Sequence, residues 1–108
     1  MQLGQATAAI GHLKTLCTHY LAQEAPPQGF TFLINLATAY QAVDRDPSIE
    51  SLFEQTLKKW GQYPTPWVAR GKILLHQGDK AQAKLHYERA LALDPNNAEI
   101  IKLKQNTT

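Results

Sequence analysis

Residues 64–97 read PTPWVARGKILLHQGDKAQAKLHYERALALDPNN and contain the clearest structural signal in the chain. Gly78 and Asp79 divide this stretch into two segments in which apolar residues recur every three or four positions, as they do on one face of an amphipathic helix. Gly78 can end the first helix in the left-handed conformation, and Asp79 can cap the second. The stretch is therefore predicted to form a tight hairpin of two helices, which Pro95 terminates.

Turn-forming residues divide the rest of the chain in the same way, and no segment alternates apolar and polar residues with a period of two. We therefore expect helices only. The expected helices span about 3–24, with an optional break at Gly11, then 30–43, 47–60, 65–77, 80–93 and 97–105. In the last helix the residues expected to face inward are Ile100, Ile101 and Leu103.

Two helix starts carry the same dipeptide signal. Asp46 precedes Pro47, and Thr65 precedes Pro66. In each pair the first residue can accept a hydrogen bond from the first turn, and the proline suits the first helical position because its missing N–H has no partner there. The sequence predicts N-caps at Asp46 and Thr65.

A shift of 34 residues superimposes the second third of the chain on the last third without a gap. The aligned pairs are Leu33 with Trp67, Ala37 with Gly71, Tyr40 with Leu74, Phe53 with Tyr87, and Leu57 with Leu91. Large residues match large ones, and small residues match small ones. A single hairpin of this length cannot bury its apolar stripe alone, so neighbouring hairpins must stack.

Residues 64–97 closely resemble a tetratricopeptide repeat. The matching residues are Trp67, Gly71, Leu74, Gly78, Asp79, Ala83, Tyr87, Ala90, Asp94, Pro95, Asn96 and Asn97. Gly71 and Ala83 are small where the paired helices must touch, and the rings of Trp67 and Tyr87 are expected to fill the volume beside them. Arg70 stands where the family usually has an aliphatic residue, so we expect its stem to pack and its guanidinium to reach solvent.

The resemblance divides one 108-residue domain into four parts. Residues 30–63 look like a degenerate copy, in which Ile49 replaces a small residue and implies a looser or tilted helix pair. Residues 1–29 are expected to form an N-terminal helix or partial repeat, and residues 98–108 a capping helix and tail. The expected fold is all-α: a short tetratricopeptide-type helical repeat, or α-solenoid, of about 2.5 helix-turn-helix repeats with a C-terminal capping helix.

Composition excludes several classes of protein. Hydrophobic residues make up 44% and charged residues 19% of the chain, which excludes a disordered tail. No apolar run approaches the roughly 20 residues that span a bilayer, so membrane insertion is not expected. The N-terminal residues lack the pattern of a secretory signal, and a cytoplasmic location is expected. Cys17 is the only cysteine, which excludes an internal disulfide.

Catalysis and nucleic-acid binding are not expected. The net charge is only +2, and the basic residues of the last third alternate with acidic ones, as on a solvated mixed face. Nucleophile, phosphate-loop and zinc-protease motifs are absent from the sequence. His12 and His19 lie seven residues apart, about 10 Å along a helix, which is too far for one metal. We therefore expect no enzyme activity, no metal and no cofactor.

In tetratricopeptide-repeat proteins the first helices of the pairs line a concave groove that usually holds a peptide. The resemblance therefore implies a protein or peptide partner and a scaffold or assembly role. The groove face lies about one residue from the core face of each helix. The groove residues it nominates are Thr31, Ile34, Asn35, Thr38, Gln41, Thr65, Val68, Lys72, Leu75 and His76.

A variant of the family grips a pair of C-terminal carboxylates. Of its ligand-binding residues, only Asn35 stands at a matching position here. Thr65 and Ala69 occupy positions where the variant has basic residues. That ligand is therefore not expected.

The N-terminal region suggests an alternative. Residues 1–43 contain only Lys14 and Glu24 as charged side chains. Such a surface caps a repeat array poorly, so it is expected to meet another subunit or further repeats of a longer chain. In the first case the protein is a self-associating structural unit, a homo-oligomer without a groove ligand.

Overall fold

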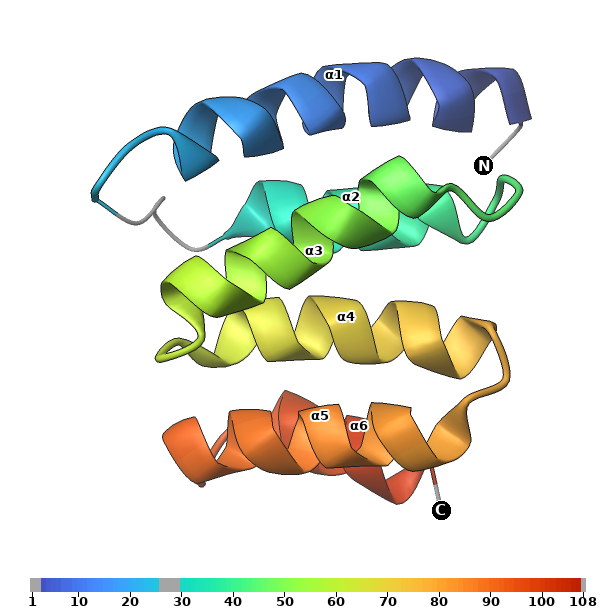
Figure 1. Cartoon of the computed structure of the whole chain (residues 1–108). Coiled ribbons are helices and arrows are strands. Elements are labelled where there is room, and N and C mark those ends of the chain that lie inside the picture. Colours follow the sequence, from blue (N-terminus) through green and yellow to red (C-terminus); the bar gives the residue numbers. More distant parts are fainter. Residues whose placement is uncertain (1–2, 26–29, 108) are drawn as a thin grey trace.

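The computed structural model describes residues 3–25 and 30–107, and helices account for most of them (Figure 1). The helices are α1 (Leu3–Leu21), α2 (Thr31–Tyr40), α3 (Pro47–Trp60), α4 (Pro64–His76), α5 (Lys80–Leu93) and α6 (Ala98–Gln105). No strand occurs among these residues, and the expected all-α fold is confirmed. Each expected helix has a counterpart whose ends agree within about one turn. The first helix is continuous through Gly11, so the optional break there is wrong.

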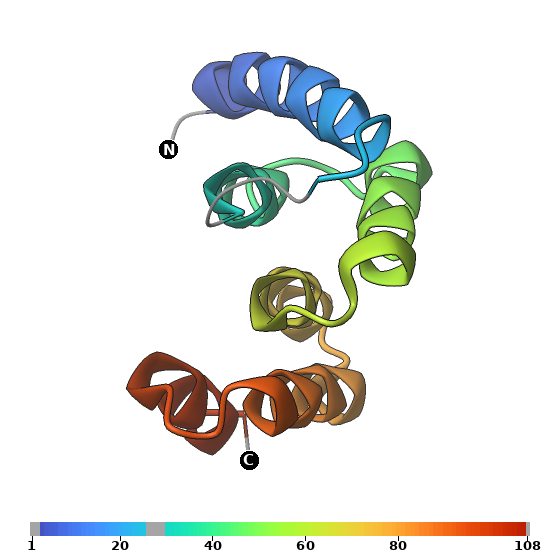
Figure 2. The ribbon, with the colours of Figure 1, turned by 90° about the vertical axis from the view of Figure 1, so that its left-hand side faces the viewer.

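The helices stack into a curved array. α1 lies at one end of the stack, and α5 with α6 lies at the other (Figure 1). In the perpendicular view, α1, α3 and α5 trace an outer arc, and α2, α4 and α6 lie on its inner side (Figure 2). The inner helices therefore form the concave face of the molecule.

α4 and α5 form the closest helix pair, because small residues let them approach. The ring of Tyr87 covers Gly71, where an added Cβ would lie only 2.7 Å from the ring Cε1. Ala83, Tyr87 and Ala90 have no exposed surface. The turn between the helices is as expected, since Gly78 has φ of 87° and the Asp79 carboxylate accepts from the Gln82 N–H at 3.2 Å.

α2 and α3 do not form an equally close pair. α2 packs mainly against α1 and α4, and α3 crosses in front of it at an angle (Figure 1). Ile49 and Phe53 are each only 1% exposed, so α3 presents bulky side chains toward its neighbours. The looser pair that Ile49 predicts in this hairpin is confirmed.

The two proline signals have different outcomes. Asp46 caps α3 as expected, since its carboxylate accepts from the Ser48 N–H at 2.9 Å. The cap expected at Thr65 is wrong, because α4 begins at Pro64 and follows Tyr63, which makes no side-chain cap bond. Pro64 takes the first helical position for the same reason that favours proline there, and Thr65 lies within the first turn.

The core consists of two clusters that meet at α2 and α4. One joins α1, α2, α3 and part of α4, and the other joins α4, α5 and α6. Ile34 packs against both. In α6, Ile100 is buried and Leu103 half-buried, but Ile101 is 37% exposed, against expectation. Adjacent helix residues point about 100° apart, so Ile100 and Ile101 cannot both face α5.

A pair of glycine substitutions tests the close approach of α4 and α5. We expect Gly71→Ala to lower the free energy of unfolding by about 1–3 kcal/mol, because the buried ring of Tyr87 cannot retreat from the new methyl group. Gly11→Ala is the matched control. Nothing lies within 4 Å of the Cβ position of Gly11, and α1 should gain about 0.5–1 kcal/mol from the better helix former. Urea denaturation followed by circular dichroism measures both, and equal effects would contradict the packing.

Candidate functional site

A hollow of about 440 Å³ opens on the concave side, where α2, α4, α5 and α6 meet. Its lining residues are Thr38, Gln41, Lys72, Leu75, His76, Tyr87 and Leu103. Five of them, Thr38, Gln41, Lys72, Leu75 and His76, are among the ten groove residues predicted from the sequence. The volume suits a few side chains of a bound peptide more than a whole folded partner.

The other five predicted groove residues do not line this hollow. Thr31 and Asn35 are exposed on α2. Ile34 is half-buried between the two core clusters, and Thr65 is half-buried in the first turn of α4. Val68 is only 6% exposed and belongs to the core, so it offers little surface to a ligand.

The polar groups of the hollow give it a positive character. Lys72 is half-buried and makes no ion pair within residues 3–25 and 30–107. None of the seven lining residues is acidic. Thr38 already donates to the carbonyl oxygen of Ile34 at 3.0 Å. Lys72 is therefore the one fully charged group in the lining, and the amide of Gln41 lies on the same wall.

Tyr87, which the sequence assigned only to the core, is also among the residues that line the hollow. Its side chain is buried, and its hydroxyl has no hydrogen-bond partner among the described residues. Burial raises the pKa of this hydroxyl, so it keeps its proton near neutral pH. Leu103 was also missed. Leu103 could have been assigned to the site from the position of α6, because α6 continues the row of inner helices.

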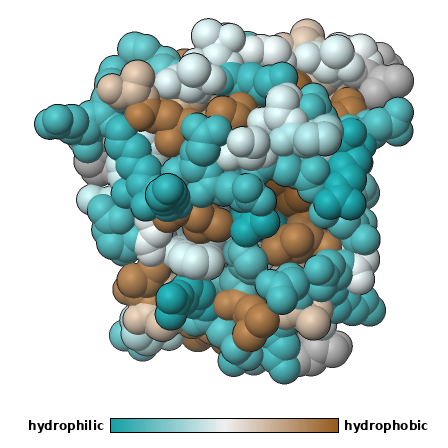
Figure 3. Space-filling model, in the orientation of Figure 1, coloured by the Kyte–Doolittle hydropathy of each residue, from teal (hydrophilic) through white to brown (hydrophobic). Residues whose placement is uncertain are grey.

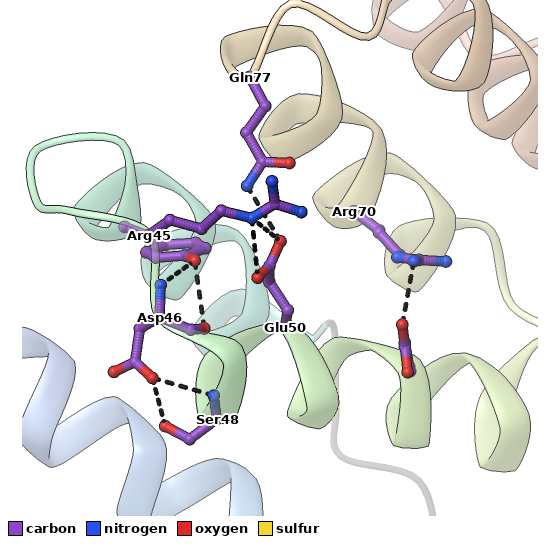
Figure 4. A network of polar contacts seen from close by, with 8 residues as sticks. Arg45, Asp46, Ser48, Glu50, Arg70 and Gln77 are labelled. Atoms are coloured by element: carbon purple, nitrogen blue, oxygen red, sulfur yellow. Dashed lines mark hydrogen bonds and ion pairs between the residues drawn. The ribbon is translucent and has the colours of Figure 1, made fainter.

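The outer face carries a different polar cluster, between α3 and α4 (Figure 4). The Glu50 carboxylate accepts from Arg45 Nε at 3.0 Å and from Gln77 Nε2 at 3.1 Å. Arg70 donates to Glu54 at 3.3 Å. The contact with Arg45 lowers the pKa of Glu50. These charges satisfy one another across the two helices, so the cluster joins α3 to α4.

Arg70 is half-buried, and its guanidinium group pairs with the exposed carboxylate of Glu54 at the surface. The same group lies 3.5 Å from Nε2 of His86. His86 Nδ1 contacts the Gln82 carbonyl oxygen at 2.7 Å, so Nδ1 carries the proton and Nε2 faces Arg70 as an acceptor. Burial lowers the pKa of His86, which favours this neutral form.

Trp67 lies beside this outer cluster, half-buried at the start of α4. Its indole N–H donates to the Gly61 carbonyl oxygen at 2.8 Å, and Arg89 lies 5.5 Å above the ring. The whole outer face is mainly hydrophilic, with separate small hydrophobic areas (Figure 3). A second hollow of about 460 Å³ lies on this side, next to Trp67 and the exposed Leu85 of α5.

The described residues contain no group of three or more His, Cys, Asp and Glu side chains placed to hold a metal ion. His12 and His19 are both exposed on α1. Within the same part of the chain, none of the helices combines the length and the hydrophobicity that crossing a membrane requires.

The unpartnered hydroxyl can be tested by removing it. We expect Tyr87→Phe to leave the free energy of unfolding unchanged or to raise it by up to about 1 kcal/mol, because the variant loses a buried polar atom that has no partner within residues 3–25 and 30–107. Thermal and urea denaturation measure the change. A loss of more than about 1 kcal/mol would mean that the hydroxyl makes a stabilising hydrogen bond.

Comparison with known proteins agrees with the geometry of the α4–α5 hairpin. The family model described as tetratricopeptide repeat matches residues 64–97. Over 80 residues the chain is 30% identical to the protein O-mannosyl-transferase TMTC3 of Homo sapiens and to that of Mus musculus. Each match covers 73% of this chain but 9% of the relative, so the chain spans less than a tenth of their length. No solved structure matches the chain. Residues 64–97 are thus a tetratricopeptide repeat, and the described part of the chain has the all-α architecture of a tetratricopeptide-type helical repeat.

Proposed function

We propose that the protein is an interaction module that holds a segment of a partner polypeptide against the concave face formed by α2, α4 and α6. Tetratricopeptide repeats serve in general as protein-interaction modules, and the match of residues 64–97 to this repeat supports a binding role. The hollow between the inner helices carries the proposal, because it gathers exposed and half-buried side chains from three separate helices at one place. A scaffold or assembly role follows from such a module.

The mixed chemistry of the concave face suits a peptide. Asn35 and Gln41 carry amide groups that can both donate to and accept from the backbone of an extended chain. Leu75 and the half-buried Ile34 supply apolar contact. Binding sites for polypeptides combine these features, with apolar contact at the centre and hydrogen bonds around it.

We propose a binding role and not a catalytic one. The relatives are named as mannosyl-transferases, but the match covers 9% of their length. That match supports a shared repeat architecture. The chemistry of the hollow also fits binding, because its lining offers one lysine, one histidine and one tyrosine with no carboxylate to act with them as a base.

Self-association through α1 is the alternative. Ala8, Gly11 and Thr15 are exposed on the outward side of α1, and no charged residue lies among them. The upper edge of the space-filling view is correspondingly pale, which marks intermediate hydropathy (Figure 3). A protein that uses this surface would form a homo-oligomer and leave the concave face without a ligand.

A pull-down with paired variants separates these functions. We expect Lys72→Glu combined with Asn35→Ala to lose the partners that the wild-type chain retains from a cell extract, because both changes alter the concave face. Lys58→Glu is the control, since Lys58 is exposed on α3 and its substitution makes the same change of charge. Quantitative mass spectrometry measures the retained proteins, and light scattering measures the oligomeric state of each variant.

The possible results of this experiment distinguish groove binding from self-association. Partners that are lost only in the concave-face variant, at an unchanged oligomeric state, support the groove. Partners that are retained equally by all three proteins contradict it. A wild-type chain that forms a stable oligomer, without partners of its own, supports self-association through α1.

A further inference from the structure

The hollow beside Trp67, called the outer hollow below, lies between the start of α4 and α5. Its volume of about 460 Å³ is close to the 440 Å³ of the concave hollow. The two hollows share no lining residue. A segment bound in the outer hollow therefore contacts none of the residues that line the concave one.

The apolar surface of the outer hollow comes mainly from Trp67 and Leu85. Leu85 is 54% exposed, the largest exposed fraction that the structure shows for a bulky hydrophobic residue. The indole N–H of Trp67 already donates to the carbonyl oxygen of Gly61, so the ring offers a ligand only its apolar surface. A lone exposed leucine is common on proteins, but this one borders a hollow that a tryptophan ring also lines. The pair can bury an apolar side chain of a partner.

Arg89 supplies an unbalanced charge to the same hollow. The Cζ atom of its guanidinium lies 5.5 Å from the centre of the Trp67 ring, and the group makes no ion pair within residues 3–25 and 30–107. Glu88 is the one acidic residue in the lining, and it pairs with Lys104 of α6 at 3.7 Å. Stacking on the ring orients the guanidinium and leaves its N–H donors available. Arg89 is therefore placed to bind a carboxylate through two parallel hydrogen bonds.

The rest of α5 adds to the positive charge. Lys80 is exposed and Lys84 is half-buried, and neither forms an ion pair in the part of the chain that the structure describes. Glu88 is the one acidic residue of this helix. A surface of this sign attracts a negatively charged partner. Leu85 and Arg89 are four residues apart and share one face of α5, so a single short segment can contact both.

We propose that the outer hollow is a second docking site, which receives a leucine-sized apolar side chain of an acidic partner polypeptide. The apolar side chain lies between the ring of Trp67 and Leu85, and a neighbouring carboxylate of the partner binds Arg89. Tryptophan and arginine are also the residue types that contribute most to binding at protein interfaces. The site extends the proposed function, because a module with docking sites on both sides can hold two partners at once.

Nuclear magnetic resonance of the ¹⁵N-labelled full chain tests the proposal with two blocked peptides, acetyl-GELLEG-amide and acetyl-GQLLQG-amide. The blocked ends carry no charge, so the peptides differ only in their side-chain carboxylates. We expect the glutamate peptide to shift the amide signals of Leu85, Arg89 and Ala92, and to bind about three to ten times more tightly than the glutamine peptide. Equal affinity for the two peptides would overturn the acidic preference.

Three variants assign the binding to its residues. Leu85 and Arg89 are both exposed, so changing them should leave the fold intact. Arg89→Gln should abolish the preference for glutamate, and Leu85→Ser should weaken both peptides at least about threefold. Lys102→Gln is the control, since it removes one positive charge from an exposed position on α6, outside the hollow, and should change neither result. A preference that survives in the Arg89 variant would contradict the assignment.

The second site and the concave groove can fail separately. The pull-down changes Lys72 and Asn35, whereas the peptide experiment follows Leu85 and Arg89. If neither peptide shifts the outer-hollow signals, the second site is wrong and the test of the groove is unaffected. If the glutamate peptide shifts the signals of Lys72 and Leu75 instead, the second site is again wrong, because the acidic segment then binds the concave face.

Discussion

The contact between the ring of Tyr87 and the backbone at Gly71 determines how the rest of the structure is arranged. Because Gly71 has no side chain, α5 can approach α4 until the ring covers the helix backbone. This approach fixes the rotation of α4 about its axis. Lys72 and Leu75 are thereby directed to the concave side, where Tyr87 itself forms part of the wall. One residue pair thus supports both the fold and the candidate site.

Curvature of the array follows from how unequally its helix pairs are packed. α4 and α5 are held closely by small residues, whereas Ile49 and Phe53 occupy the space around α3. α3 is instead joined to α4 by the polar cluster on the outer side, in which Glu50 accepts from both Arg45 and Gln77 (Figure 4). The outer helices are therefore spread apart relative to the inner ones. α2, α4 and α6 remain close enough to enclose a hollow.

Local signals in the sequence were sufficient to predict the helices. Gly78 and the proline at position 47 act through backbone conformation within one turn, so their effect does not depend on the rest of the fold. Thr65 shows the limit of such signals. Two prolines compete to begin α4, and the sequence alone does not reveal that Pro64 takes the first position. The resemblance to a repeat family supplied the order in which the helices stack.

The candidate site was less predictable, because it depends on contacts between distant helices. Helix geometry placed Lys72 on the face where the hollow lies. It could not show that Val68 is buried in the core or that Leu103 of α6 lines the hollow. Tyr87 was assigned to packing, because the sequence cannot show that its hydroxyl meets no partner among the residues that the structure describes. Arg70 likewise pairs with Glu54 of the neighbouring hairpin. The sequence could not predict this partner, because the pair depends on how α3 packs against α4.

A double-mutant cycle tests the central contact most directly. The change in unfolding free energy caused by Gly71→Ala is measured in the wild-type chain and again in a chain carrying Tyr87→Leu, which has no ring to meet the new methyl group. The structure predicts that the penalty at position 71 falls by at least about 1 kcal/mol in the second background, since the two residues touch. The same penalty in both backgrounds would show that the ring does not rest on Gly71.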